Sequence, residues 1–239
     1  MVTHKAWEKN LLIKYLCPRD FRRGEMEEKM KKTIQTILAI TTSILLTGLG
    51  VALFVHANLG SDTLTVFVDG LHRVLNCSYG TASRIYNLIV LVIALIVSRK
   101  NIGWATIVYA LSVGFTMDYF EKLLQPLQIQ SAGMMIRLIC VCSGQICFGI
   151  TYALLIKYRK GMNQIDAISY AIVDKTGISF KWIRTGMDVV LLVSGWLLGG
   201  VVGVGSIIAM TTTGVLVDFI LNIISKKEKN DEEFANGIS

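Results

Sequence analysis

The chain has 239 residues, of which 53% are hydrophobic and only 17% are charged, and its mean hydropathy is +0.55. A soluble domain usually carries about 25% charged residues. Here the charges gather in residues 1–32 and 225–239, while long internal stretches hold almost none. This pattern excludes an ordinary soluble domain and is typical of an all-α membrane protein, because the hydrocarbon of a bilayer excludes charge.

The net charge of +7 does not indicate a nucleic-acid partner. The Lys and Arg residues form short clusters beside apolar runs, as juxtamembrane residues do, and no stacking aromatics are patterned among them. The five cysteines form no CxxC pair and no Cys/His spacing suited to a metal. We therefore expect the lipid bilayer as a partner, and no nucleic acid, metal or cofactor.

Residues 1–32 form a polar, basic segment that we interpret as a cytosolic tail. It has no sustained apolar core before Thr33 and no small-residue cleavage site, so it does not resemble a signal peptide. The first apolar run would then serve as an uncleaved insertion signal. Met26 and Met30 are alternative native starts.

Six apolar runs follow, and each has about the 20 residues needed to cross a bilayer core of about 30 Å. They cover approximately 33–56, 80–98, 102–122, 132–156, 180–200 and 203–225. We predict a transmembrane domain over 33–225, with a second cytosolic tail at 226–239. Short turns near 99–101 and 199–203 join the second run to the third and the fifth to the sixth.

Two shorter segments, 61–77 and 163–175, are too short and too charged to cross a bilayer. Their apolar residues recur at helical spacing, whereas Asp62, Asp69, Asp166 and Asp174 fall elsewhere. We predict two amphipathic helices that either lie in the membrane interface or fold back into the protein as re-entrant segments.

The basic clusters predict the orientation. Lys and Arg are dense in the N-terminal tail, at 99–100, at 157–160 and at 226–229, and sparse in the alternate connections. These clusters share one side of the membrane only if six helices cross it. Because positive loops stay inside, we predict a multi-pass protein of the cell (inner) membrane with both termini in the cytoplasm.

The two halves of the chain match at a fixed offset of 100 residues. The matches include rare residues, Arg84 with Arg184 and Asp118 with Asp218, as well as Gly114 with Gly214. Upstream the offset becomes 104, where Asp62 meets Asp166. We predict one repeat at about 33–124 and a second at about 132–225. Each contains three spans, an odd number, so the repeats are inverted.

The repeat predicts two intramembrane ion pairs. Arg84 lies 17 residues before the turn centred near 101, and Asp118 lies 17 residues after it, so an antiparallel helix pair places them at one depth. The same geometry pairs Arg184 with Asp218, one pair near the outer face and one near the inner face. The pairs are either structural clasps that offset the cost of intramembrane charge, or gates on a transport path.

Six further polar residues are candidate solute contacts. Asp62 and Asp166 each stand at an expected helix start, where a carboxylate ordinarily stabilises the helix dipole. Alternatively, two re-entrant helix starts meet near the midplane and present these carboxylates to a cation or polar solute. The candidate set is Asn58, Asp62, Asn87, Asn163, Asp166 and Asp188.

Enzymatic chemistry finds little support in the residues. The three histidines have no partner at metal spacing, and the chain contains no HExxH or GxSxG motif. No GxxxxGK[ST] or GxGxxG motif follows a strand either. We therefore do not expect an enzyme.

The stretch from Gly48 to Gly80, with its Gly-rich first helix, A-x-LG motif and following polar patch, resembles the opening of the YczE/YyaS/YitT group of bacterial membrane proteins. The pieces Gly103–Thr106 and Gly114–Asp118 look similar too. Many members have a Pro-aromatic-Asp sequence after the LG, where this chain has Ser61-Asp62-Thr63. The resemblance covers about 33–225 and implies a bacterial inner membrane.

Together these features favour a small inverted-repeat transporter or channel-like protein for a small polar solute or ion, with a homodimer as a candidate assembly. The alternative is a non-transporting accessory or scaffold protein whose charges are purely structural.

Overall fold

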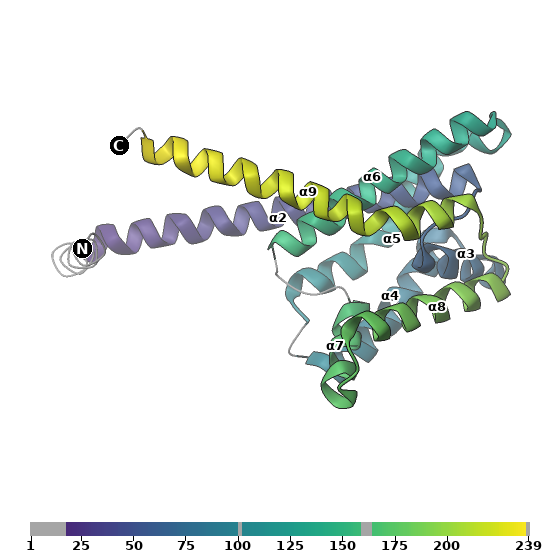
Figure 1. The fold of residues 1–239 in the computed structure, drawn as a ribbon, viewed down its shortest axis with the longest axis horizontal. Coiled ribbons are helices and arrows are strands. Elements are labelled where there is room, and N and C mark those ends of the chain that lie inside the picture. Colours follow the sequence, from purple (N-terminus) through teal and green to yellow (C-terminus); the bar gives the residue numbers. More distant parts are fainter. Residues whose placement is uncertain (1–17, 100–101, 159–163, 238–239) are drawn as a thin grey trace. The chain divides into compact units, whose positions relative to one another are not determined.

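The computed structural model describes residues 18–99, 102–158 and 164–237, and these residues form helices joined by short connections, with no strand among them (Figure 1). The chain divides into two compact units, 1–39 and 40–239. The first unit is described from Pro18 onward as helix. The second unit holds the remaining helices and the site.

The six apolar runs all form helices. They are α2 (Pro18–Ala57), α4 (Tyr79–Ser98), α5 (Trp104–Leu124), α6 (Met134–Tyr158), α8 (Phe180–Leu197) and α9 (Val204–Gly237). Two short 3-10 turns, Gln125–Leu127 and Ile129–Ser131, link α5 to α6. The amphipathic segments form α3 (Thr63–Leu75) and α7 (Gln164–Thr176). Helices α2 and α9 extend beyond the expected limits at 33 and 225 into segments that we interpret as tails.

Four of these helices are long and apolar enough to cross a membrane by length and composition: Thr33–Ala57, Tyr79–Ser98, Met134–Lys157 and Val204–Lys226. Helices α5 and α8 are helical where expected but more polar. Helix α8 carries Lys181, Arg184 and Asp188 within 18 residues, and α5 carries Asp118, Glu121 and Lys122. The crossing of α5 and α8 therefore stays a prediction.

The helices of the second unit form two sets of contacts, which the close packing of α4 on α5 joins. In one set α3 packs on α8 and on α4, and α7 packs on α4 and on α8. In the other, the 40–57 part of α2 contacts α5, where Thr116 Oγ1 donates to the Ile44 carbonyl at 3.1 Å, and α6 packs on α9. Phe54 of α2 stacks on Phe148 of α6 at a centroid distance of 5.4 Å. Each amphipathic helix thus packs on one long helix from each half, α4 and α8.

Helices α4 and α5 form a close antiparallel hairpin. A Cβ added to Gly114 would lie 2.5 Å from both the Gly80 carbonyl oxygen and Arg84 Cγ, so the two backbones approach as only glycine allows. Helices α8 and α9 differ. They lie apart, joined by the non-helical stretch 198–203 (Figure 1).

The stretch 198–203 is held against other helices instead of forming a tight turn. The Asp69 carboxylate of α3 accepts from the Val201 backbone N–H at 2.8 Å, and the Gly205 N–H donates to the Leu59 carbonyl at 2.8 Å. Gly60, at φ +88°, lies directly against Gly203 and Ser206. These contacts direct α9 onto α6 and explain why the second hairpin does not match the first.

Candidate functional site

The centre of the site is the guanidinium of Arg184 on α8. Its Nε lies 3.4 Å from Asp166 Oδ1, and its Nη2 lies 3.4 Å from Asp188 Oδ1 one turn along the same helix. Asp166 comes from the first turn of α7. The exposed fractions of the three side chains are 28%, 35% and 26%, so this ion triad is partly shielded from solvent.

The first half of the chain reaches the same triad through the start of α3. The Thr63 hydroxyl donates a hydrogen bond of 3.1 Å to Asp188 Oδ1. The preceding residue, Asp62, is the N-cap of α3, and its Oδ1 is buried without a hydrogen-bond partner in the structure. Burial raises the pKa of the Asp62 carboxyl, because desolvation disfavours the charged form.

Two tyrosines lie near this cluster, Tyr86 buried and Tyr152 partly buried. Tyr86 of α4 lies close enough to Arg184, Asp62 and Asp188 to interact electrostatically with them. Tyr152 of α6 is likewise close enough to Asp62 and Arg184 to interact electrostatically with them. Their rings replace water on one side of the cluster, which strengthens the charge interactions nearby.

The cluster contains more acidic groups than basic ones, and some of its buried polar atoms have no hydrogen-bond partner. Two carboxylates, on Asp166 and Asp188, share the Arg184 guanidinium, and Asp62 lies near Asp188 as a third acidic group. Both Arg184 Nη1 and Asp62 Oδ1 are buried without hydrogen-bond partners in the structure. Burial raises the pKa of Asp166 as well, against the opposing effect of Arg184. An unpaired buried donor and acceptor are costly, so this arrangement suits a site that receives a polar solute, ion or water.

Asp62, Asp166 and Asp188 are therefore brought together, but the asparagines are not part of the same contacts. Asn58 follows the last residue of α2 and has a φ of +50°. Its backbone N–H donates to the carbonyls of Phe54 and Val55, and its side chain is exposed. Asn87 donates to Ser83 Oγ one turn away at 3.2 Å. Asn163 lies outside the described residues. Asn58 thus serves helix termination, a use that its left-handed backbone explains.

The first expected ion pair is present. Arg84 Nη2 lies 3.3 Å from Asp118 Oδ2, across the α4–α5 hairpin. The other oxygen of Asp118 accepts from the Gly80 backbone N–H at 2.8 Å, in the first turn of α4. Arg84 also donates to Thr81 Oγ1 at 2.7 Å, and its guanidinium lies 4.4 Å from the centre of the Phe115 ring.

The second expected ion pair is not what the structure shows. Arg184 bonds Asp166 and Asp188, while Asp218 on α9 is exposed. The expectation assumed a close α8–α9 hairpin, whereas the fastening of 198–203 to α3 directs α9 onto α6. Equal spacing of Arg184 and Asp218 from the turn between their helices therefore did not suffice to predict that they pair.

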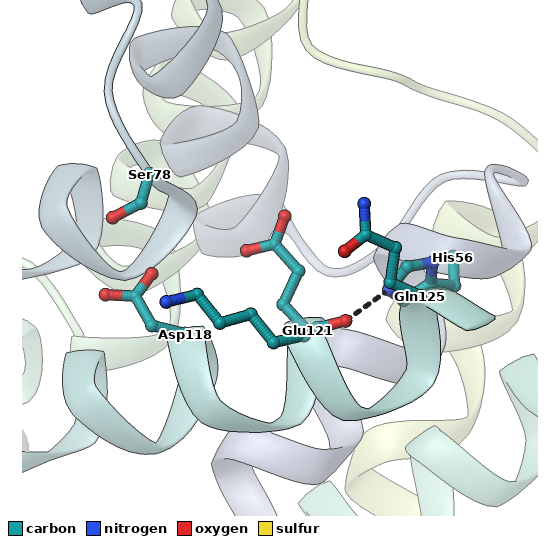
Figure 2. Close-up of a pocket in the computed structure, with 6 residues that line it drawn as sticks. His56, Ser78, Asp118, Glu121 and Gln125 are labelled. Carbon is teal, nitrogen blue, oxygen red and sulfur yellow. Dashed lines mark hydrogen bonds between the residues drawn. The ribbon is translucent and has the colours of Figure 1, made fainter.

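A cavity of about 270 Å³ opens beside the first ion pair, where the end of α2, the start of α4 and the end of α5 meet (Figure 2). His56 Nε2 lies 3.0 Å from the Glu121 carbonyl oxygen. The cavity is lined by His56, Ser78, Asp118, Glu121, Lys122 and Gln125. Its walls are thus polar and carry both signs of charge.

No group of three or more His, Cys, Asp or Glu side chains in the described ranges is placed to hold a metal ion. The described cysteines, Cys77, Cys140, Cys142 and Cys147, are free thiols.

Comparison with known proteins places the chain in a family. Residues 34–222 match the model of a family described as "Family of unknown function (DUF6198)". The chain belongs to this family. No solved structure matches it.

Two relatives of this DUF6198 protein are bacterial. It is 28% identical over 195 residues to a protein of Haemophilus influenzae named "Uncharacterized protein", covering 82% of this chain and 86% of the relative. It is 25% identical over 140 residues to the "Uncharacterized membrane protein YczE" of Bacillus subtilis, covering 49% of this chain and 63% of the relative. The resemblance to the YczE group is thus confirmed, and with the apolar helices it identifies a membrane protein.

Sequence reasoning missed two side chains of this DUF6198 protein that organise the site. Thr63 carries the contact between the halves, and Asp69 fastens the α8–α9 connection. Asp69 stood out only as a charge on an amphipathic helix, and its partner is a backbone N–H 132 residues away. No local pattern identifies such a partner.

Proposed function

We propose that this DUF6198 protein is a six-span, inverted-repeat transporter or channel-like protein of the bacterial inner membrane that moves a small polar solute or ion. The observation that carries the proposal is that the acidic helix starts of the two halves meet at one cluster. Asp166 pairs with Arg184, and Thr63, the residue after Asp62, bonds Asp188. Buried polar atoms of Asp62 and Arg184 are left without hydrogen-bond partners there. Inverted-repeat transporters place their sites at helix starts between the repeats.

The packing supports an inverted repeat. The contacts of α3 with α8 and α4 have counterparts in those of α7 with α4 and α8, and the contact of α2 with α5 has a counterpart in that of α6 with α9. Thr47 and Thr151, which are separated by the upstream repeat offset of 104, share a hydrogen bond of 3.5 Å. Equivalent residues meet each other only near a two-fold axis, so this contact supports a pseudo-two-fold relation between the halves.

The placement of α3 and α7 among the spanning-length helices favours re-entrant segments over interfacial ones. An interfacial helix exposes one face to headgroups and keeps its charges in water. In α3 the residues Thr63, Thr65 and Asp69 are buried instead. Polar backbone and side chains at membrane depth are tolerated where they line a cavity or protein interior.

Transport is tested with purified protein in liposomes. Stopped-flow light scattering under gradients of glycine, glycerol and KCl would reveal a flux above that of empty vesicles. We expect Asp62→Asn and Asp166→Asn to reduce this flux strongly. The matched control is Asp174→Asn, the same change at an exposed position of α7. Folded protein without flux under any of these gradients would favour the accessory or scaffold role.

Topology is tested by reporter fusions. The proposal places the 99–101 turn, the 157–160 connection and both termini in the cytoplasm. A periplasmic signal from either connection would contradict six spans with this orientation.

A further inference from the structure

The two halves of the chain match in sequence but differ in contacts, and this difference is informative. In the first half Gly114 is packed against Gly80 and Arg84, and Arg84 is paired with Asp118. In the second half the matching Gly214 has no atom within 4 Å of an added Cβ, and the matching Asp218 is exposed.

The same residue types occur at the same spacing in both halves, so the second half retains what the first uses to close a hairpin. A glycine on α9 permits close approach, an aspartate one turn later offers an acceptor, and Arg184 on α8 carries a long side chain that can bond a carboxylate. Helix α9 is also the most exposed of the four apolar helices. Only 11% of its apolar stretch is buried in the protein, against 39% or more for the other three. Its Gly214–Asp218 face is therefore available to pack.

We propose that Asp218 is the alternate partner of Arg184, and that the exchange of Arg184 from Asp166 and Asp188 to Asp218 accompanies closure of α8 on α9. The inference rests on the proposed transport function and its topology. The helix group α3, α4, α7 and α8 would rock against the group α2, α5, α6 and α9, closing one hairpin as the other opens. Rocking of one bundle against another is how inverted-repeat transporters alternate access.

The exchange of partners by Arg184 would change the net charge of the site. In the described conformation the pair Arg84–Asp118 of the first half is closed, and two carboxylates hold Arg184 at the proposed solute site. When Arg184 moves to Asp218, Asp166 and Asp188 lose their cation and the site becomes more acidic. The affinity for a cationic group at the site would then differ between the two states, which is what couples solute binding to a conformational change.

Cysteine cross-linking tests this inference. In a background with the five native cysteines replaced by serine, Phe180→Cys and Gly214→Cys occupy the positions that match the touching Gly80 and Gly114. We expect an intramolecular disulfide between them under mild oxidation in membranes. The control pairs Phe180→Cys with Val215→Cys, a neighbouring residue that is 73% exposed, and should cross-link much less.

Two charge variants sharpen the test. Asp118→Asn should open the first hairpin and raise the 180–214 cross-linking rate by roughly threefold, a modest factor because partly exposed ion pairs are weak. Asp218→Asn should lower the rate by a similar factor. If Asp218 is merely a surface carboxylate, the second variant leaves the rate unchanged and the inference is wrong.

Other outcomes are equally decisive. Absence of the 180–214 cross-link in folded protein, with and without Asp118→Asn, overturns the inference. A covalent dimer formed through Gly214→Cys alone also overturns it, because a second copy then covers this face. Liposome flux in the same cysteine-free background separates the two proposals. Flux without the cross-link contradicts only the exchange, and the cross-link without flux contradicts only the transport function.

Discussion

Thr63 donates a hydrogen bond of 3.1 Å to Asp188, and this bond joins two residues that are 125 positions apart in the chain. It connects the start of the amphipathic helix of one half to the longer helix that carries Arg184 in the other. The site therefore belongs to neither half alone. Each half contributes an acidic helix start, and the second half contributes the guanidinium.

We predict that Asp62→Asn raises the thermal stability of the detergent-purified protein by a few degrees at pH 7–8. Burial raises the pKa of Asp62 in the folded state above its unfolded value, so its ionised form costs stability above the folded pKa. Asparagine removes this cost and remains a good N-cap.

Because the folded-state pKa of Asp62 is raised, the stability gained by Asp62→Asn depends on pH. Below the unfolded pKa the wild-type carboxyl is protonated in both states and the cost is absent. The difference in melting temperature between Asp62→Asn and the wild type should therefore shrink as the pH falls. A difference that grows toward acidic pH would show that Asp62 is stabilising as a carboxylate.

We predict that Arg184→Gln destabilises the protein, because Asp166 and Asp188 then face each other without a cation. Since all three side chains are about a quarter to a third exposed, we expect a loss of about 1 kcal/mol, or about 2–4 °C in melting temperature. The double variant Arg184→Gln with Asp166→Asn should recover part of the loss. Additive losses in the double-mutant cycle would argue against the triad.

The charge reversal Arg84→Asp with Asp118→Arg should recover only part of the stability that each single change removes. An ion pair alone tolerates reversal, but Asp118 also accepts from the Gly80 N–H, and arginine cannot accept a hydrogen bond. Thermal melts of the two single variants and the double variant measure the recovery. Complete recovery would mean that the bond to Gly80 contributes nothing.

Gly114→Ala and Gly214→Ala form a matched pair of substitutions at equivalent positions of the repeat. The Cβ at 114 would lie 2.5 Å from the Gly80 carbonyl, while the Cβ at 214 would meet no atom within 4 Å. We expect Gly114→Ala to cost about 1–3 kcal/mol through overpacking. Gly214→Ala should be neutral or stabilising by up to about 1 kcal/mol, because alanine has the higher helix propensity. Equal losses in melting temperature would contradict the asymmetry between the hairpins.

The helices of this protein follow closely from its apolar periodicity. All six runs and both amphipathic segments are helical, since helix formation and burial of apolar residues are specified locally. The Arg84–Asp118 contact could also be predicted, because a short turn determines the depth of residues on both sides of it.

The second hairpin could not be predicted in the same way. Its connection is fastened by Asp69 and by the Leu59 carbonyl, which lie far away in the sequence. This half of the chain holds four aspartates that could pair with Arg184, and spacing along α8 and α9 pointed to Asp218. The packing of α7 and α8 selected Asp166 and Asp188 instead, and such a choice depends on tertiary structure.

The hydrogen bond from the Gly205 N–H to the Leu59 carbonyl has a consequence for biosynthesis. Residue 59 follows α2, and residue 205 lies in the first turn of α9, 146 positions later in the chain. The Leu59 carbonyl therefore gains this partner only after the ribosome has added α3 to α8 and the start of α9. Nascent chains that end before residue 205 should hold Asp62 loosely, so the cluster around Arg184 takes its full form only after synthesis of α9 has begun.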